Sequence, residues 1–160
     1  MLDYDLVTAK AAYRILTPDQ LPAFLELVER YHAERQSERP DGRQKTLTTV
    51  RELTRHKRAG SLFVIERGKD LVGYCVVINH WSNALGGNVL CLDELYVSPE
   101  HRGLGIATDF VELLAKIAPA DSVALELRPS ASSRKAASLC KRLRFREPGT
   151  RAVVREIGER

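Results

Sequence analysis

The sequence predicts an α/β fold: an α+β sandwich with a mixed, mostly antiparallel central sheet of six to seven strands, flanked by about four helices. Two observations predict it. Segments with apolar residues at helical spacing alternate along the chain with short β-rich segments. Between residues 62 and 97, three β-rich segments follow one another with only short turn-like links, which is typical of an antiparallel meander. The length of 160 residues fits a single domain, 1–160.

The first elements are a strand and a helix. Residues 11–16 are expected to form the strand. The helix then starts with Thr17 as its N-cap, Pro18 at the first helical position and Gln20 three residues after the cap. Apolar residues follow at helical spacing and give this helix one apolar face.

A polar stretch, 32–45, follows this helix. Gly42 lies within it and is expected to act as a breaker. A second, shorter helix is expected over 46–58, and the 30–45 region would contribute residues to a cleft.

The meander and the elements after it follow the same logic. The three strands are expected over 62–66, 71–79 and 89–97. The strongest helical periodicity in the chain runs from Ile106 to Ala118. A buried strand at 123–127, a helix capped by Ser132 or Ser133, a short strand near 145 and another at 152–157 complete the predicted fold.

Composition excludes several classes of protein. Apolar residues make up 44% of the chain and charged residues 29%, which is ordinary for a globular domain. The apolar runs are far shorter than the ~20 residues of a membrane-spanning helix. The first ten residues contain two acids and no apolar core, so they do not resemble a secretory signal. Three widely spaced cysteines, without a CxxC pair, favour neither a disulfide framework nor a zinc site, and we expect a reducing, cytoplasmic location.

The charge is unevenly distributed. Residues 128–160 hold 10 basic and 3 acidic side chains, whereas residues 1–127 hold 15 basic and 18 acidic ones. The basic end could face a polyanion such as a phosphorylated cofactor, or it could be a solvated cationic surface.

A loop with two glycines precedes the strongest helix. Its sequence is Arg102-Gly103-Leu104-Gly105-Ile106-Ala107. The start of a helix presents N–H groups that bind anions, and glycines let a phosphate approach the backbone closely. A dinucleotide fingerprint would need glycine in place of Thr108, and the Gly-Lys-Ser/Thr of a P-loop is absent. A pyrophosphate site of the pattern Arg-x-x-Gly-x-Ala and a plain tight turn both remain open.

Residues 92–107, from Leu92-Asp93-Glu94-Leu95-Tyr96-Val97 through the glycine loop, closely resemble the acetyl-CoA-binding core of the GNAT superfamily of N-acetyltransferases. Residues 134–145 resemble the last helix of that family and the start of the strand after it, and the order of elements also fits. Within the family, the Asp-Glu-Leu-Tyr-Val segment is nearest to diamine and polyamine acetyltransferases.

The resemblance implies a GNAT-like sheet with a splayed strand pair and a cofactor site between the two strands. Backbone groups of Leu95, Tyr96 and Val97 would bind the pantetheine arm of acetyl-CoA, and Ser133 stands where an Asn often contacts it. The pyrophosphate would be held by the loop and first helical turn, namely Arg102, Gly103, Leu104, Gly105, Ile106, Ala107 and Thr108. Arg134 and Lys135 would lie near the phosphorylated adenosine end or simply on a solvated helix face. No metal is expected.

The catalytic residues implied are Asp93, Glu94 and Cys140. An amine must lose its proton before it attacks a thioester, and a carboxylate can accept that proton. Adjacent strand residues point to opposite faces, so only one of the two acids would face the cleft unless a bulge re-aims them. Asp93 ranks slightly ahead of Glu94 as the base. Cys140 replaces the family's Tyr and could protonate the leaving thiolate, or it could be a small buried apolar residue.

These residues predict an acetyl-CoA-dependent N-acetyltransferase that acts on the primary amine of a small cationic substrate by direct attack. A catalytically degenerate CoA-binding sensor or scaffold, and an acetyltransferase for protein N-termini or lysines, are the alternatives. The expected partners are acetyl-CoA, a small amine and a second copy of the chain in a homodimer, with no nucleic acid and no membrane. His32, at the end of the first helix, could line the acceptor cleft.

Overall fold

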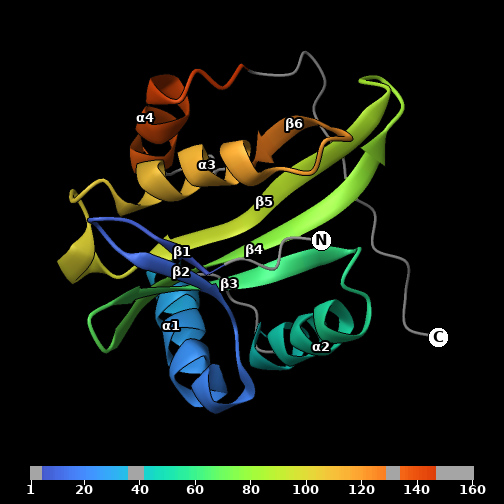
Figure 1. The fold of residues 1–160 in the computed structure, drawn as a ribbon. Coiled ribbons are helices and arrows are strands. Elements are labelled where there is room, and N and C mark those ends of the chain that lie inside the picture. The colour runs from blue at the N-terminus through green and yellow to red at the C-terminus, as the bar shows by residue number, and fades with distance from the viewer. Residues whose placement is uncertain (1–4, 36–41, 129–133, 147–160) are drawn as a thin grey trace. The chain divides into compact units, whose positions relative to one another are not determined.

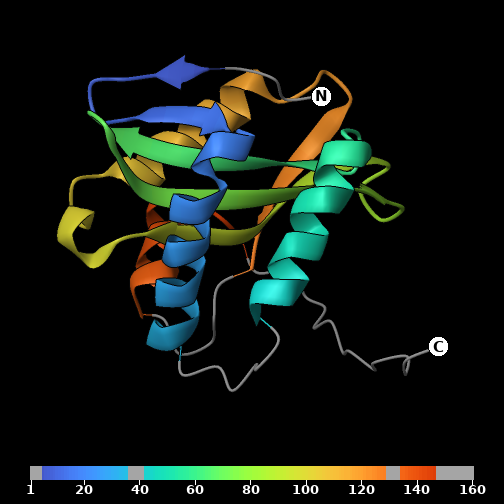
Figure 2. The ribbon, with the colours of Figure 1, turned by 90° about the horizontal axis from the view of Figure 1, so that it is seen from below.

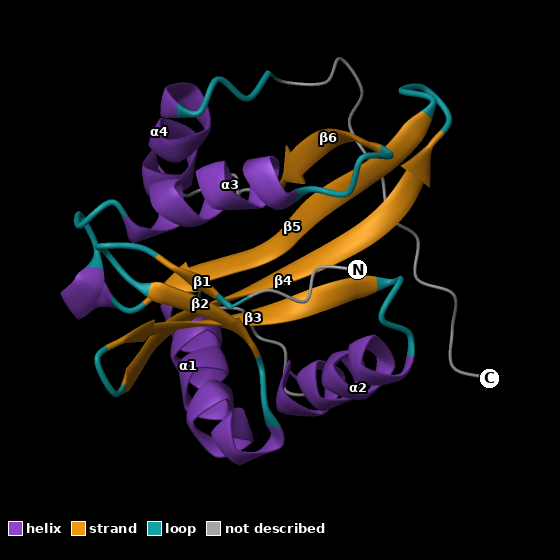
Figure 3. Ribbon diagram, viewed as in Figure 1, coloured by secondary structure: helices purple, strands orange, loops and turns teal. Residues whose placement is uncertain are grey.

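The computed structural model describes residues 5–35, 42–128 and 134–146. The chain divides into two compact units, 1–128 and 129–160, which are described separately. In the first unit a mixed sheet carries helices on both faces, as predicted (Figure 1; Figure 3). The predicted single domain, 1–160, stays a prediction.

The sheet has six strands that neighbour one another in chain order. The first four pairs are antiparallel and the last pair, β5 and β6, is parallel. The strands are β1 (Leu6–Val7), β2 (Ala12–Ile15), β3 (Gly60–Arg67), β4 (Asp70–Ser82), β5 (Gly87–Val97) and β6 (Ser122–Leu127).

Helices cover both faces of this sheet. Helices α1 (Leu21–Glu34) and α2 (Gly42–Arg55) lie on one face and α3 (Ile106–Ile117) on the other (Figure 2). Two short 3-10 turns, η1 (Pro18–Gln20) and η2 (Pro99–His101), precede α1 and α3. At the predicted helix start, the Gln20 side chain accepts a bond from the Thr17 N–H at 3.1 Å.

Alternation along β3 builds a core on each face of the sheet. Leu62 and Val64 pack in the cluster formed with α1 and α2. Phe63 points the other way and meets Phe110 of α3 with ring centroids 5.3 Å apart. Because all four side chains are buried, both helical layers are fixed to the same strands.

The predicted bounds of α2 were wrong at its start. The helix begins at Gly42 instead of residue 46, so Gly42 does not act as a breaker. Gly42 is buried, and a Cβ built on it would lie 3.1 Å from the imidazole ring of His32. Close approach of α2 to the end of α1 therefore accounts for a glycine at this position.

Strands β5 and β6 part before β5 ends. Their pairing runs from Asn88 to Leu92 on β5 and stops with Leu127 on β6. Within the described residues, the segment Glu94–Val97 has a strand partner only on its β4 side. The predicted splayed pair is thus present. Among the described residues, the β6 side of Glu94–Val97 is unpaired, and this is the open edge of β5.

The second unit contains α4 (Arg134–Arg142). Its end is a Schellman motif, in which the N–H of Phe145 bonds to the carbonyl of Cys140 at 2.9 Å and that of Arg144 to Lys141 at 3.2 Å. Arg144 has a φ of 58°, a left-handed conformation usually taken by glycine. Residues 145–146 are not in a strand, so the strand predicted near 145 was wrong there. The caps Ser132 and Ser133 and the strand 152–157 lie outside the described residues.

Across the described part of the chain, no helix combines the length and apolar character needed to span a membrane.

Candidate active site

The acidic pair lies at a bulge in β5. Val76 of β4 pairs with Glu94, and its neighbour Val77 pairs with Leu92, so Asp93 is the extra residue on β5. Directly paired residues share a face of the sheet, so Glu94 lies on the same face as Val76. A bulge adds a residue and re-aims its side chain, which allows two consecutive side chains to reach one site.

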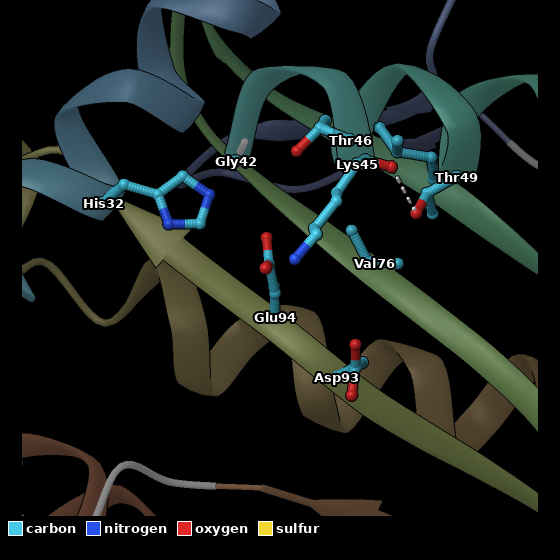
Figure 4. A pocket seen from close by; sticks show the side chains of 9 residues that line it. His32, Gly42, Lys45, Thr46, Thr49, Val76, Asp93 and Glu94 are labelled. Carbon is cyan, nitrogen blue, oxygen red and sulfur yellow. Dashed lines mark hydrogen bonds between the residues drawn. The ribbon is translucent and has the colours of Figure 1, made fainter. Parts of the chain in front are cut away.

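Both carboxylates line one cavity of about 180 Å³ on the α1 and α2 side of the sheet (Figure 4). The floor comes from β3, β4 and β5, and the opposite wall from the end of α1 and the first turns of α2. The lining residues are His32, Gly42, Lys45, Thr46, Thr49, Leu62, Val76, Asp93 and Glu94. The cavity is smaller than the roughly 300–1,000 Å³ of pockets for drug-sized ligands, so it fits a small molecule or the end of a larger one.

Glu94 is the more buried of the two acids. Burial raises the pKa of Glu94, and the hydroxyl of Tyr74, which donates to the carboxylate at 2.9 Å, acts in the opposite direction. The charges of His32 and Arg35 also favour the ionised form of Glu94. A carboxylate with a raised pKa is a stronger base, so Glu94 is suited to take a proton from an ammonium group.

Asp93 has a different environment. Its side chain is 46% exposed, and the carboxylate lies 3.6 Å from the guanidinium of Arg128. Because Asp93 is exposed and paired with Arg128, it is better suited to attract a cation than to accept a proton in the reaction. Burial and the bond from Tyr74 make Glu94 suited to act as a base, whereas the sequence ranks Asp93 slightly ahead; which acid takes the proton stays a prediction.

The glycine loop reaches α3 through two left-handed residues. Gly103 has a φ of 81° and Gly105, the N-cap of α3, a φ of 78°. The first bond of the helix joins the Asp109 N–H to the Gly105 carbonyl at 3.0 Å, so the N–H groups of Ile106 and Ala107 precede the helical ladder. These N–H groups at the start of the helix suit an anion. Leu104 lies exposed on the same turn.

Arg102 does not extend from this loop as a lone cation. Its Nε donates to the carbonyl of Val97 at 2.7 Å, and its Nη2 pairs with Glu34 at 2.6 Å. Tyr96 donates to the other oxygen of Glu34 at 2.8 Å, and the guanidinium lies 5.5 Å from the centroid of the Tyr96 ring. Burial acts to raise the pKa of Glu34, but the bonds from Arg102 and Tyr96 outweigh it and lower that pKa. Arg102 thus ties the loop to the end of α1.

The residues expected to bind pantetheine lie on the open edge of β5. Leu95, Tyr96 and Val97 follow the bulge and end the strand. The carbonyl of Val97 already accepts a bond from Arg102, so the chain itself engages part of that backbone.

Two predicted residues belong to the second unit. Cys140 lies on α4, and Ser133 lies outside the described residues. Burial raises the pKa of the Cys140 thiol, which keeps it protonated at neutral pH. Within the described ranges, no three His, Cys, Asp or Glu side chains are grouped as metal ligands would be.

Sequence reasoning missed Lys45, Thr46, Thr49 and Tyr74. The first three lie on α2. Lys45 precedes the predicted start of this helix, whereas Thr46 and Thr49 lie within it but belong to a face that the sequence could not place against the sheet. Tyr74 is one of several aromatic residues in the strands, and nothing in the sequence marks its bond to Glu94.

The family model for the acetyltransferase (GNAT) family matches residues 21–145. The chain belongs to the GNAT family of acetyltransferases. No curated protein is similar enough in sequence to count as a match. The matched GNAT region contains α1, α2, the bulge, the glycine loop and α4, so it includes every described residue of the candidate site.

Solved structures share the GNAT fold at low sequence identity. A possible acetyltransferase from Clostridium difficile 630 is 19% identical, with a TM-score of 0.78 over 93% of this chain and 99% of that one. A ribosomal-protein-alanine N-acetyltransferase from Brucella melitensis biovar Abortus 2308 is 21% identical, with a TM-score of 0.70 over 92% and 99%. A predicted acetyltransferase with acetyl-CoA from Clostridium acetobutylicum is 14% identical, with a TM-score of 0.71 over 91% and 96%. These structures support the fold, and none of them identifies the acceptor.

Proposed function

We propose that this chain transfers the acetyl group of acetyl-CoA to the primary amine of a small acceptor that is cationic at that nitrogen, by direct attack. The observation that carries the proposal is the bulge, which brings Asp93 and Glu94 into one small cavity beside the open edge of β5. The comparisons give no support to the diamine and polyamine subfamily, so the acceptor class must be argued from the cavity itself.

The residues present fit acetyl-CoA. The left-handed Gly103 and Gly105 leave room at the start of α3, where backbone N–H groups suit a pyrophosphate. The unpaired edge of β5 offers main-chain groups of Leu95 and Tyr96 to an extended arm. When bound, acetyl-CoA supplies an activated acetyl thioester.

Glu94 provides the proton transfer in this proposal. The acceptor enters as an ammonium ion, and the acidic pair attracts it. Glu94 takes one proton, directly or through a water molecule, and leaves a nitrogen lone pair free. That lone pair forms the C–N bond while the C–S bond of the thioester breaks, and the nitrogen releases its second proton to water as it becomes the neutral amide.

The departing thiolate of CoA must then gain a proton. Cys140 is the donor that the sequence suggests, and water can serve instead. After donating its proton, Cys140 would have to take one back from solvent in each cycle. Replacement of Cys140 by Ser removes the thiol and so distinguishes donation by Cys140 from donation by water. A cytosolic location and a homodimer stay predictions.

The test is an acetyl-transfer assay. The full chain is incubated with acetyl-CoA and a panel of primary amines, free thiol is followed, and CoA binding is measured separately by calorimetry. The proposal expects CoA binding and amine-dependent thiol release. CoA binding without transfer to any amine would favour a sensor or scaffold, and absence of CoA binding would overturn the proposal.

A further inference from the structure

The cavity that holds the two carboxylates is also lined by two basic side chains. Lys45 lines it from the first turns of α2, and His32 lines it from the end of α1. Figure 4 shows the Glu94 carboxylate between the His32 ring and the amino group of Lys45. The wall opposite the acidic floor is therefore basic.

Lys45 has not been neutralised by a neighbour in the described chain. None of the ion pairs within 4.0 Å among the described residues includes Lys45, and Asp93 is engaged with Arg128 instead. Thr49 donates to the backbone carbonyl of Lys45 at 3.1 Å, a bond that leaves the ammonium group unused. The ammonium group thus keeps its donors for a ligand.

The acidic and basic side chains of the cavity would each bind an acceptor group of the opposite charge. An ammonium end is stabilised beside Glu94 and Asp93, and an anionic oxygen group is stabilised beside Lys45, with the Thr46 hydroxyl lining the same wall. A diamine or polyamine would place its second cation against Lys45, and like charges at close range oppose binding. The small volume keeps both ends within one short molecule.

We propose that the acceptor is a small zwitterion, a primary amine that also carries a carboxylate or phosphate, and that Lys45 selects it. This inference rests on the proposed function and names its substrate class. Lys45 acts here on specificity, by binding the anionic end, and takes no part in the proton transfer.

The test compares amines of matched length. Wild-type chain is assayed with acetyl-CoA and 4-aminobutyrate, 3-aminopropyl phosphate, butylamine and 1,4-diaminobutane. A fifth arm uses a short peptide with a free N-terminus and an amidated C-terminus. The inference expects kcat/KM for one or both anionic amines to exceed that for butylamine and for the diamine by about tenfold or more, a factor equal to about 1.4 kcal/mol. The carboxylate and phosphate arms show which anion the site prefers.

Lys45→Met should remove this preference. Its kcat/KM for the anionic amine should fall about tenfold, mainly through KM, while that for the diamine stays level or rises. Lys69→Met, in the exposed β3–β4 turn, is the matched control and should change neither value.

Two results would overturn the inference while leaving the proposed function intact: a preference for the diamine, butylamine or the peptide, or an unchanged preference in Lys45→Met. If no amine is acetylated, the result counts against the proposed function, and the inference of a zwitterionic acceptor is overturned as well.

Discussion

At the scale of single residues, the proposed reaction depends most on Glu94. It is a partly buried carboxylate. Burial raises its pKa, and the hydrogen bond from the Tyr74 hydroxyl offsets part of that rise. A base in this condition responds to small changes around it, because each hydrogen bond to the charged form shifts the balance between its two protonation states.

Tyr74→Phe should therefore move the pH dependence of activity. The variant loses the hydrogen bond that the Tyr74 hydroxyl donates to the Glu94 carboxylate, so the pKa of Glu94 rises further. The acidic limb of the kcat/KM profile should shift to higher pH, with a larger loss of activity at neutral than at alkaline pH. Tyr31→Phe is the control, since its hydroxyl bonds with Arg35. An unmoved acidic limb in Tyr74→Phe would exclude Glu94 as the titrating base.

The sequence located part of this site. The acidic pair followed from the resemblance of residues 92–107 to the GNAT core, and the possible place of His32 from its position at the end of a helix. Lys45 and Tyr74 did not, because their positions in the cavity depend on which strand and helix pack together. The bulge that brings Asp93 and Glu94 to one cavity was also beyond the sequence.

At the scale of elements, the glycine loop places two residues in the left-handed region and the end of α4 places one. Helices, strands and their order could be predicted because apolar spacing dictates them. The two-residue strand β1 and the early start of α2 could not, because neither has a periodic pattern and both depend on packing.

Gly105→Ala tests the loop. A Cβ there would lie 3.2 Å from the flexible end of Lys10, so the main cost is the left-handed backbone, roughly 1–2 kcal/mol. We expect the Kd for acetyl-CoA to rise about tenfold by calorimetry. Gly68→Ala is the control, because Gly68 has a φ of 65°, lies in open space and belongs to the β3–β4 turn. Equal CoA affinity in the two variants would show that the loop does not form the pyrophosphate site.

Arg144→Gly tests the end of α4. Arg144 occupies the position of the Schellman motif that favours glycine, at a φ of 58°. Glycine relieves the steric cost and adds some freedom to the unfolded chain, so the free energy of unfolding should rise by about 0.5–1 kcal/mol. Urea unfolding followed by circular dichroism measures it. Lys141→Gly, within the helix, should instead lose about 1 kcal/mol; a loss in Arg144→Gly as well would contradict the assigned cap.

At the scale of the whole molecule, charge and topology separate two ligands. The acidic pair lies in the first unit, and the basic residues concentrate in 128–160. In the proposed function, the cavity on one face of the sheet would take the acceptor, and the open edge of β5 with the glycine loop after it would take acetyl-CoA. Reaction at that strand is the central claim.

The raised pKa of Glu94 also predicts how its replacement should affect folding stability. A carboxyl whose pKa is raised by folding favours the folded state below its unfolded pKa, and this contribution is lost as the pH rises through the folded pKa. Above its folded pKa the ionised Glu94 therefore costs stability, and glutamine at this position can still accept the bond from Tyr74. Glu94→Gln should not lower the melting temperature, so a loss of activity in this variant cannot be blamed on unfolding.

The most direct measurement is kcat for acetyl transfer by Glu94→Gln, with CoA affinity measured on the same preparation. The account predicts a fall in kcat of about 100-fold or more, with CoA affinity unchanged and a smaller fall in Asp93→Asn. Turnover by Glu94→Gln at the wild-type rate would contradict it.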